Sequence, residues 1–134
     1  MQNDNSKLKI VKYLGVDYGE KRIGLALADS ETKIATPFKV VNSLEEIIKI
    51  VDDEEIDTLI VGKPYQISNS QFPISTQFTN FIDNLKSKIK IPIELIDERL
   101  SSKAVDQLSG SKKTKASRDA IAAMIILQSY LDRA

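Results

Sequence analysis

Residues 14–29 read LGVDYGEKRIGLALAD, and the rest of the chain can be placed around this stretch. The residues from Leu8 to Val16 predict one strand, and those from Arg22 to Asp29 predict a second. Between them, the segment Asp17 to Lys21 contains Gly19 and predicts a turn. The pattern indicates a β-hairpin in which a carboxylate, that of Asp17, follows directly on the first strand.

Downstream of this hairpin, strand patterns alternate with helix patterns. Residues 33–41 predict a third, antiparallel strand, in which Pro37 favours an edge position or a bulge. Ser43 and Glu46 form a capping box at the start of a helix. Apolar runs then predict two buried strands, over 58–62 and 93–96. Apolar stripes predict one helix between these strands, over 74–89, and two helices after them, over 100–108 and 117–131.

The last of these helices is apolar on almost all sides, which predicts an interior position, and Ser117 is its expected N-cap. The expected fold class is α/β: a mixed five-stranded sheet with an N-terminal antiparallel hairpin and helices on both faces. Residues 1–134 are expected to form a single domain, in which residues 1–7 are frayed.

Composition narrows the location and the chemistry. The chain has 134 residues and neither Cys nor His. No apolar run is long enough to span a bilayer and the N-terminus does not resemble a signal peptide, so the expected location is the cytoplasm, away from membranes. Without His, a Ser-His-Asp or Cys-His nucleophile is excluded, and hydrolysis has to use carboxylates, Lys, Tyr or a metal ion.

Three groups of acids follow predicted elements, and each also has an ordinary structural explanation. Asp17 fits a hairpin turn, and the pair Asp97 and Glu98 fits a polar strand end, where alternation directs the two side chains to opposite faces. Asp119 fits a first helical turn, where the helix dipole favours a carboxylate. Together, acids from these three segments could hold one or two Mg²⁺ or Mn²⁺ ions for phosphodiester cleavage.

Basic residues cluster locally on a chain whose formal net charge is zero. They flank the acids and are candidates for contacts with a phosphate backbone, although such clusters are often only solvated surface. The candidates are Lys21, Arg22, Arg99, Lys112, Lys113, Lys115 and Arg118.

Three motifs, residues 14–29, 97–102 and 119–132, resemble the YqgF-type family of pre-16S rRNA nucleases. The resemblance implies a three-layer ribonuclease-H-like fold related to Holliday-junction resolvases, and maturation of the 5′ end of 16S rRNA in ribosome biogenesis. It also implies that Asp17, Glu98 and Asp119 are the catalytic, metal-binding acids, with Glu98 favoured over Asp97. The segment Ile60 to Gln66 departs from the family pattern at Lys63 and Gln66, and Lys63 is a further candidate contact for nucleic acid.

Several functions compete at this point. The main hypothesis is a metal-dependent nuclease, active on RNA or on branched DNA in the manner of a Holliday-junction resolvase, as a monomer or homodimer, with the small-subunit precursor as a partner. The turn at Asp17 and Gly19 also resembles the phosphate loop of the actin and sugar-kinase class, but that class closes two domains over its nucleotide. A non-catalytic RNA-binding ribosome-assembly factor is the third hypothesis.

Overall fold

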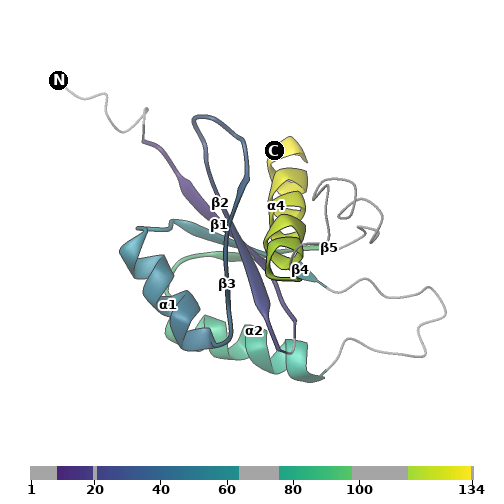
Figure 1. The fold of residues 1–134 in the computed structure, drawn as a ribbon. Coiled ribbons are helices and arrows are strands. Elements are labelled where there is room, and N and C mark those ends of the chain that lie inside the picture. The colour runs from purple at the N-terminus through teal and green to yellow at the C-terminus, as the bar shows by residue number, and fades with distance from the viewer. Residues whose placement is uncertain (1–8, 20, 64–75, 98–114, 134) are drawn as a thin grey trace.

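The computed structural model describes residues 9–19, 21–63, 76–97 and 115–133. Five strands and three helices lie within these ranges, and their arrangement is drawn in Figure 1. In chain order they are β1 (Lys12–Asp17), β2 (Ile23–Asp29), β3 (Thr36–Val41), α1 (Leu44–Asp53), β4 (Thr58–Lys63), α2 (Thr76–Lys88), β5 (Ile93–Asp97) and α4 (Lys115–Arg133).

The strands form one mixed sheet in the order β3-β2-β1-β4-β5. β1 pairs antiparallel with β2, and β2 pairs antiparallel with β3. β4 joins β1 in parallel, and β5 joins β4 in parallel. The predicted mixed sheet with its N-terminal hairpin is therefore confirmed.

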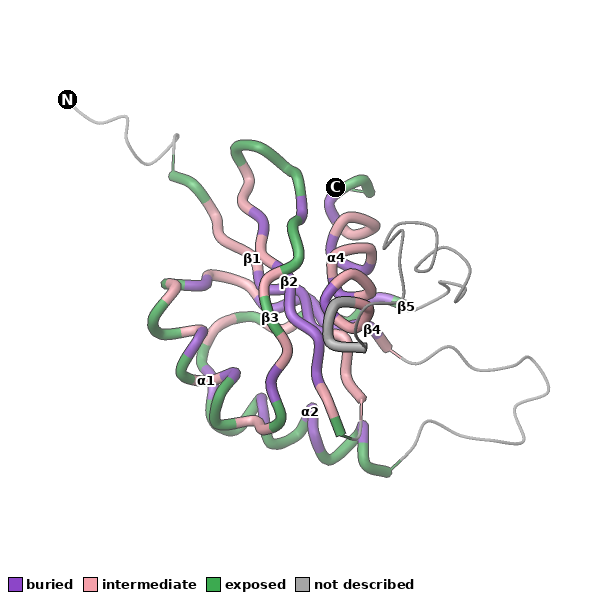
Figure 2. The backbone as a smooth tube through the Cα atoms, in the orientation of Figure 1, coloured by how far each residue is buried: buried purple, intermediate pink, exposed green. Residues whose placement is uncertain are grey.

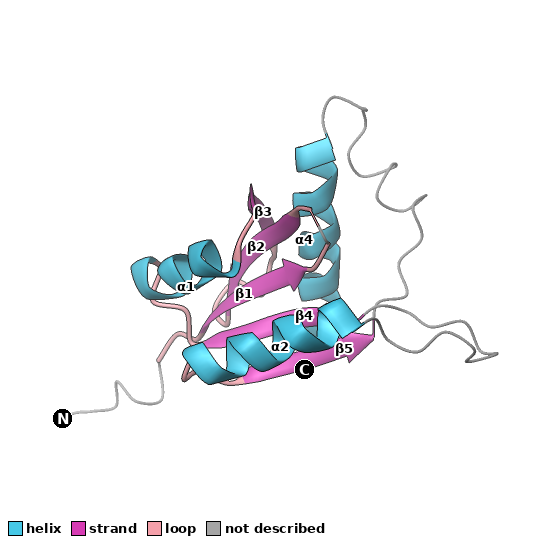
Figure 3. Ribbon diagram, turned by 90° about the horizontal axis from the view of Figure 1, so that it is seen from below, coloured by secondary structure: helices cyan, strands magenta, loops and turns pink. Residues whose placement is uncertain are grey.

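Helices cover both faces of this sheet, which gives three layers. Figure 3 shows α1 and α2 on one side and α4 on the other. Because side chains alternate along each strand, the sheet has a hydrophobic core on each face. Leu14 and Val16 of β1 face α1 and α2. On the other face, Ala26 of β2 and Ile60 of β4 pack against α4, which contributes Ala123 and Leu127. Figure 2 shows the buried backbone concentrated in the central strands and on the inner sides of the helices.

Local signals in the sequence explain several details. The register between β2 and β3 shifts at Leu25/Ala26, where Pro37 lies opposite Ala26, so Pro37 sits beside a bulge in a strand at the end of the sheet order. Ser43 caps α1 by accepting a bond from the backbone N–H of Glu46. Glu46 in turn accepts a bond from the backbone N–H of Asn42, so the capping box is confirmed with its return bond one residue earlier than usual.

The start of the last helix differs from the prediction. α4 begins at Lys115, so Ser117 is already helical and is not the N-cap. Lys115 and Ala116 have higher helix propensities than Ser, which explains an earlier start. Asp119 consequently lies beyond the first turn, and the first-turn explanation for this acid was wrong.

The environment of α4 also differs from the expected all-round burial. Its fully buried residues form one stripe, and most of the other described side chains are half-buried; the stripe consists of Ala120, Ala123, Ile126, Leu127 and Leu131. Among the described segments, no helix is long and apolar enough to cross a membrane. The predicted helix over 100–108 lies outside the described residues.

Candidate functional site

Asp17 ends β1 and projects from the sheet on the side of α4. Side chains alternate along a strand, and Gly15, two residues earlier, faces α4 so closely that an added Cβ would lie 2.8 Å from Cβ of Leu127. Asp17 therefore shares a face with Gly15 and with Tyr13, whose ring contacts Tyr130 of α4 at a centroid separation of 5.8 Å. The half-buried carboxylate stands at the edge of the sheet where the parallel strands end.

Asp119 reaches the same place from α4. Gly24 of β2 is the ladder partner of Asp17, and a Cβ added to Gly24 would overlap the backbone carbonyl of Asp119. Only a residue without a side chain allows this approach between strand and helix. The helix backbone at Asp119 therefore rests directly on the strand residue that pairs with Asp17, and two acids 102 positions apart in the sequence meet at one edge.

The side chain of Asp119 has a charged partner. Nε of Arg22 donates a 2.8 Å hydrogen bond to Oδ2 of Asp119. The two side chains retain 40% and 29% of their exposure, so the pair lies at the surface of the site rather than inside the core. Arg22 directly precedes β2 and Gly24 is the second residue of the strand; the side chain of Arg22 and the backbone of Gly24 both lie against Asp119 of α4.

The end of β5 brings a further acid to this edge, but on the other face. Asp97 pairs with Lys63 in the parallel ladder, and their side chains form a 4.0 Å ion pair. Ile96 packs in the α4 core, so Asp97 points away from α4 and away from the face of Asp17. Glu98, the acid that the resemblance favours, lies outside the described residues.

Among the described residues, no three acids lie together as a ready set of metal ligands. Asp17 and Asp119 nevertheless supply two carboxylates on one face of one edge, which suits a hard divalent cation that prefers oxygen ligands. The donor set therefore fits a magnesium or manganese ion, with room in the ligand count for a third acid and for water.

The structure describes only some of the basic residues that the sequence predicts to contact nucleic acid. Lys21 is exposed beside the hairpin turn, and its backbone carbonyl accepts a bond from Nδ2 of Asn42. Arg118 is half-buried next to Asp119, and Lys115 is the first residue of α4. Arg99, Lys112 and Lys113 lie outside the described residues.

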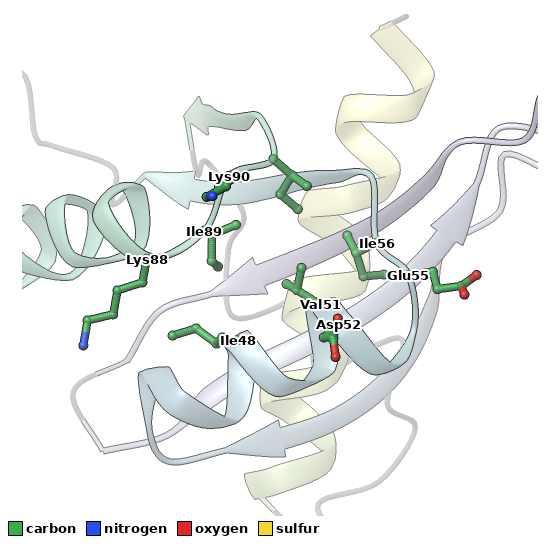
Figure 4. Close-up of a pocket in the computed structure, with 9 residues that line it drawn as sticks. Ile48, Val51, Asp52, Glu55, Ile56, Lys88, Ile89 and Lys90 are labelled. Carbon is green, nitrogen blue, oxygen red and sulfur yellow. The ribbon is translucent and has the colours of Figure 1, made fainter.

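A hollow of about 350 Å³ lies elsewhere, between the end of α1 and the end of α2, and Figure 4 shows the side chains around it. Its walls come from Ile48, Val51, Ile56 and Ile89, with Asp52 and Lys88 among the charged residues. These segments precede β4 and β5, so the hollow lies at the edge opposite Asp17 and Asp97. It does not contribute to the site.

Sequence reasoning missed two features of this arrangement. It assigned Arg22 to nucleic acid and did not foresee the bond to Asp119, and it gave Gly24 no role. The alternation of Arg22 and Gly24 carried a signal, because both had to face the same side of the sheet. The partner on that side could not be read from the sequence, since it lies in a distant segment of the chain.

The chain matches a family of known proteins over almost its whole length. Residues 11–133 match the model of the RuvX family, described as Holliday junction resolvase. A "Putative pre-16S rRNA nuclease" of Chloroflexus aurantiacus is 36% identical over 130 residues, covering 89% of this chain and 85% of the relative. A protein of the same name from Phocaeicola vulgatus is 38% identical over 132 residues, covering 90% and 95%.

A solved structure, T. thermophilus RuvC in complex with Holliday junction substrate, matches with a TM-score of 0.53 at 13% identity, covering 92% of this chain and 95% of that one. At this identity the likeness establishes the fold, which confirms the ribonuclease-H-like expectation. The family match spans almost the whole chain and the two relatives exceed a third identity, which confirms the resemblance drawn from the three motifs. The chain belongs to the RuvX family of Holliday junction resolvases and to the group of relatives named as pre-16S rRNA nucleases.

Proposed function

We propose that this chain is a divalent-metal-dependent nuclease in which Asp17, Glu98 and Asp119 are the catalytic, metal-binding acids. Nuclease activity is the function that the family and the relatives have in common. The observation that carries the assignment of residues is Gly24, which pairs with Asp17 and contacts the backbone of Asp119. A stability role alone would not require two acids to converge on one edge of the sheet.

Glu98 rather than Asp97 is the proposed third ligand. Asp97 faces the side of α2 and pairs with Lys63, which leaves it on the wrong face for a site shared with Asp17. The motif in residues 97–102 independently favours Glu98 by its resemblance to the family. The proposal therefore rests on the position of Asp97 and on the motif, not on a described position of Glu98.

The acids have a simple chemical task. One or two Mg²⁺ or Mn²⁺ ions bound there would activate water and stabilise the leaving oxygen of a phosphodiester. Asp17 and Asp119 would hold and orient these ions through carboxylate oxygens. Because the chain has neither Cys nor His, no thiol or imidazole nucleophile is available to take the place of this chemistry.

The proposed substrate is the 5′ end of pre-16S rRNA, processed in the cytoplasm on the small-subunit precursor. The names of the relatives support this choice over branched DNA, while the description of the family model supports a DNA junction as the second candidate. A labelled precursor RNA and a four-way DNA junction, tested in parallel, separate the two. We expect faster cleavage of the RNA.

The basic residues singled out in the sequence are the proposed partners of the phosphate backbone. They comprise Lys21, Lys63, Arg99, Lys112, Lys113, Lys115 and Arg118. Removing the cation at one phosphate should lower the slope of log affinity against log salt by about 0.7 for single strands or about 0.9 for duplex DNA. Replacing Lys112, Lys113 and Lys115 together with Gln should therefore flatten the salt dependence of RNA binding, measured by fluorescence anisotropy.

A cleavage assay tests the function directly. Across a series of Mg²⁺ and Mn²⁺ concentrations, with a chelator control, wild-type protein should cut. Asp17→Asn and Glu98→Gln should each reduce the rate by about 100-fold or more, since each variant removes a metal ligand. Asp97→Asn is the matched control, because it makes the same chemical change on the opposite face, and its rate should stay near wild type. Full activity in Asp17→Asn would contradict the proposal.

The same assay addresses the non-catalytic alternative. A ribosome-assembly factor would bind RNA without turnover under every metal condition, and alanine at Asp17 or Asp119 would then leave RNA binding unchanged. Binding without any cleavage by the wild-type protein would favour that function.

A further inference from the structure

Asp119 is held at two points by Arg22, which directly precedes β2, and by Gly24, the second residue of that strand. Gly24 receives the helix backbone at Asp119, and Arg22 bonds the carboxylate of the same residue. Both contacts come from alternate residues on one face of the strand start. The main chain and the side chain of Asp119 are thus fixed by the same short segment, which also pairs with β1 at Asp17.

The hydrogen bond between Arg22 and Asp119 uses one oxygen of the carboxylate. Nε of Arg22 donates to Oδ2 of Asp119, and this bond leaves Oδ1 for other partners. An arginine that approaches through Nε fixes the plane of the carboxylate more tightly than a lysine ammonium could, because the guanidinium is planar and its donors have fixed directions. The bond therefore constrains where the second oxygen points.

A permanent cation beside a metal ligand has an electrostatic cost. It lowers the net negative charge of the site and repels an incoming divalent ion, although solvent screens part of this effect at a half-exposed pair. A contact with that cost is useful to a metal site if it holds the ligand in position. Partners that orient metal ligands in this manner commonly affect metal affinity by about 10- to 100-fold.

We propose that Arg22 is a positioning residue that orients the Asp119 carboxylate for the divalent metal ion. The inference rests on the proposed function and gives Arg22 a different task from the phosphate contact expected from the sequence. Arg22 acts through Asp119 and need not touch the substrate. Metal affinity should depend on the guanidinium geometry and not only on its charge.

Calorimetric titration of the full chain with Mn²⁺, without nucleic acid, tests this. Arg22→Lys keeps the charge and loses the Nε donor, and Arg22→Gln loses both. Lys21→Gln removes the neighbouring exposed cation and controls for charge. Gln128→Leu weakens the docking of α4 at its other end, where Gln128 bonds the β2–β3 connection, and controls for a purely structural effect.

We expect Arg22→Lys and Arg22→Gln both to weaken Mn²⁺ binding by about 10-fold or more. Lys21→Gln and Gln128→Leu should remain within about twofold of wild type, even if Gln128→Leu melts at a lower temperature. Circular dichroism verifies that each variant is folded. If Arg22→Gln does not fold, Arg22→Lys decides the outcome alone.

The contrary results are equally specific. Tighter binding by Arg22→Gln, with Arg22→Lys unchanged, would show that Arg22 competes with the metal and would overturn the inference. An equal loss in Lys21→Gln or Gln128→Leu would also overturn it. Asp17→Asn separates the two proposals: if wild type binds no Mn²⁺, or Asp17→Asn binds it as well as wild type, the metal site itself is wrong and the role of Arg22 falls with it.

Discussion

Two non-glycine residues among the described segments have a left-handed backbone, Glu55 at φ 55° and Lys33 at φ 58°. Glu55 follows the end of α1, where the N–H of Ile56 reaches back to the carbonyl of Val51 and closes the helix. A side chain disfavours this conformation, which glycine adopts without cost. Glu55 is therefore a local weak point that the rest of the fold tolerates.

Replacing Glu55 with Gly should raise the free energy of unfolding by about 0.5–1 kcal/mol, because the left-handed conformation is no longer strained. Glu54→Gly is the matched control, since Glu54 has a right-handed backbone at φ −93° and should gain nothing. Urea unfolding measures both. Equal effects at the two positions would contradict the explanation.

Asp29 provides a pH-dependent contribution at the start of the β2–β3 connection. The backbone N–H of Thr32, with further bonds from the Thr32 hydroxyl and the Glu31 N–H, lowers the pKa of the Asp29 carboxyl below its ordinary value. A carboxyl with a lowered folded pKa stabilises the fold above its unfolded pKa of about 3.9, and this contribution is lost as the pH falls through the folded value.

Asp29→Ala should therefore melt at a lower temperature than wild type at pH 7, and the difference should shrink as the pH falls below about 4. Thermal unfolding followed by circular dichroism from about pH 7 to about pH 3 measures it. A difference that stays constant over this range would show that the ionised carboxylate is not responsible.

At the scale of single residues, the sequence placed candidate acids at the ends of strands and helices but did not show which residues contact them. Asp17 could be placed because a strand pattern ends at it. The bond between Arg22 and Asp119 joins residues 97 positions apart, and no local pattern encodes such a contact. The face on which Asp97 lies became known only from the structure, through its ion pair with Lys63 and the burial of Ile96 against α4.

At the scale of elements, Gln128 joins the last helix to the β2–β3 connection. Its Oε1 accepts a 2.9 Å bond from the N–H of Ala35, and its Nε2 donates a 3.0 Å bond to the carbonyl of Lys33. Ala35 is buried, so its N–H cannot easily turn to water instead. The Gln128 side chain therefore fixes the C-terminal part of α4 against the β2–β3 connection.

Gln128→Leu should lower the free energy of unfolding by about 1–3 kcal/mol, because it leaves the buried N–H of Ala35 without its acceptor. Gln77→Leu makes the same change at an exposed position of α2 and should stay within about 0.5 kcal/mol of wild type. Chemical denaturation of the two variants provides the comparison. A loss of equal size in both would assign the effect to the substitution itself and not to the hydrogen bond.

Elements with strong local signals were predicted well, and those decided by tertiary contacts were not. The capping box at Ser43 and the bulge at Pro37 follow from local chemistry. The start of α4 did not follow Ser117, since helix propensity in the preceding residues outweighed the cap. The one-sided burial of α4 depends on how the sheet meets it, which periodicity alone could not specify.

At the scale of the whole molecule, we propose that the chain folds as one domain. The two cores lie on opposite faces of the same five strands, so neither can lose its packing without exposing the other side of the sheet. Urea unfolding should give one cooperative transition, with tyrosine fluorescence and circular dichroism changing together. Two separated transitions would indicate independent units.

The mixed sheet with helices on both faces was predictable from the succession of strand and helix patterns, while the order of the strands in the sheet and the convergence of Asp17 and Asp119 were not. The convergence depends on Gly24, which has no side chain and therefore lets the backbone of α4 approach the strand. A glycine in a strand pattern does not indicate which segment will pack against it. Only the family resemblance implied, from the sequence, that the two acids belong to one site.

A metal ion shared by Asp17 and Asp119 is the feature on which the proposed function depends. A crystal structure of the wild-type protein soaked in Mn²⁺, with anomalous diffraction to locate the ion, tests it. We expect an anomalous peak bonded to carboxylate oxygens of both residues at roughly 2.0–2.3 Å. Well-ordered carboxylates of Asp17 and Asp119 with no peak between them, at saturating Mn²⁺, would contradict the shared site.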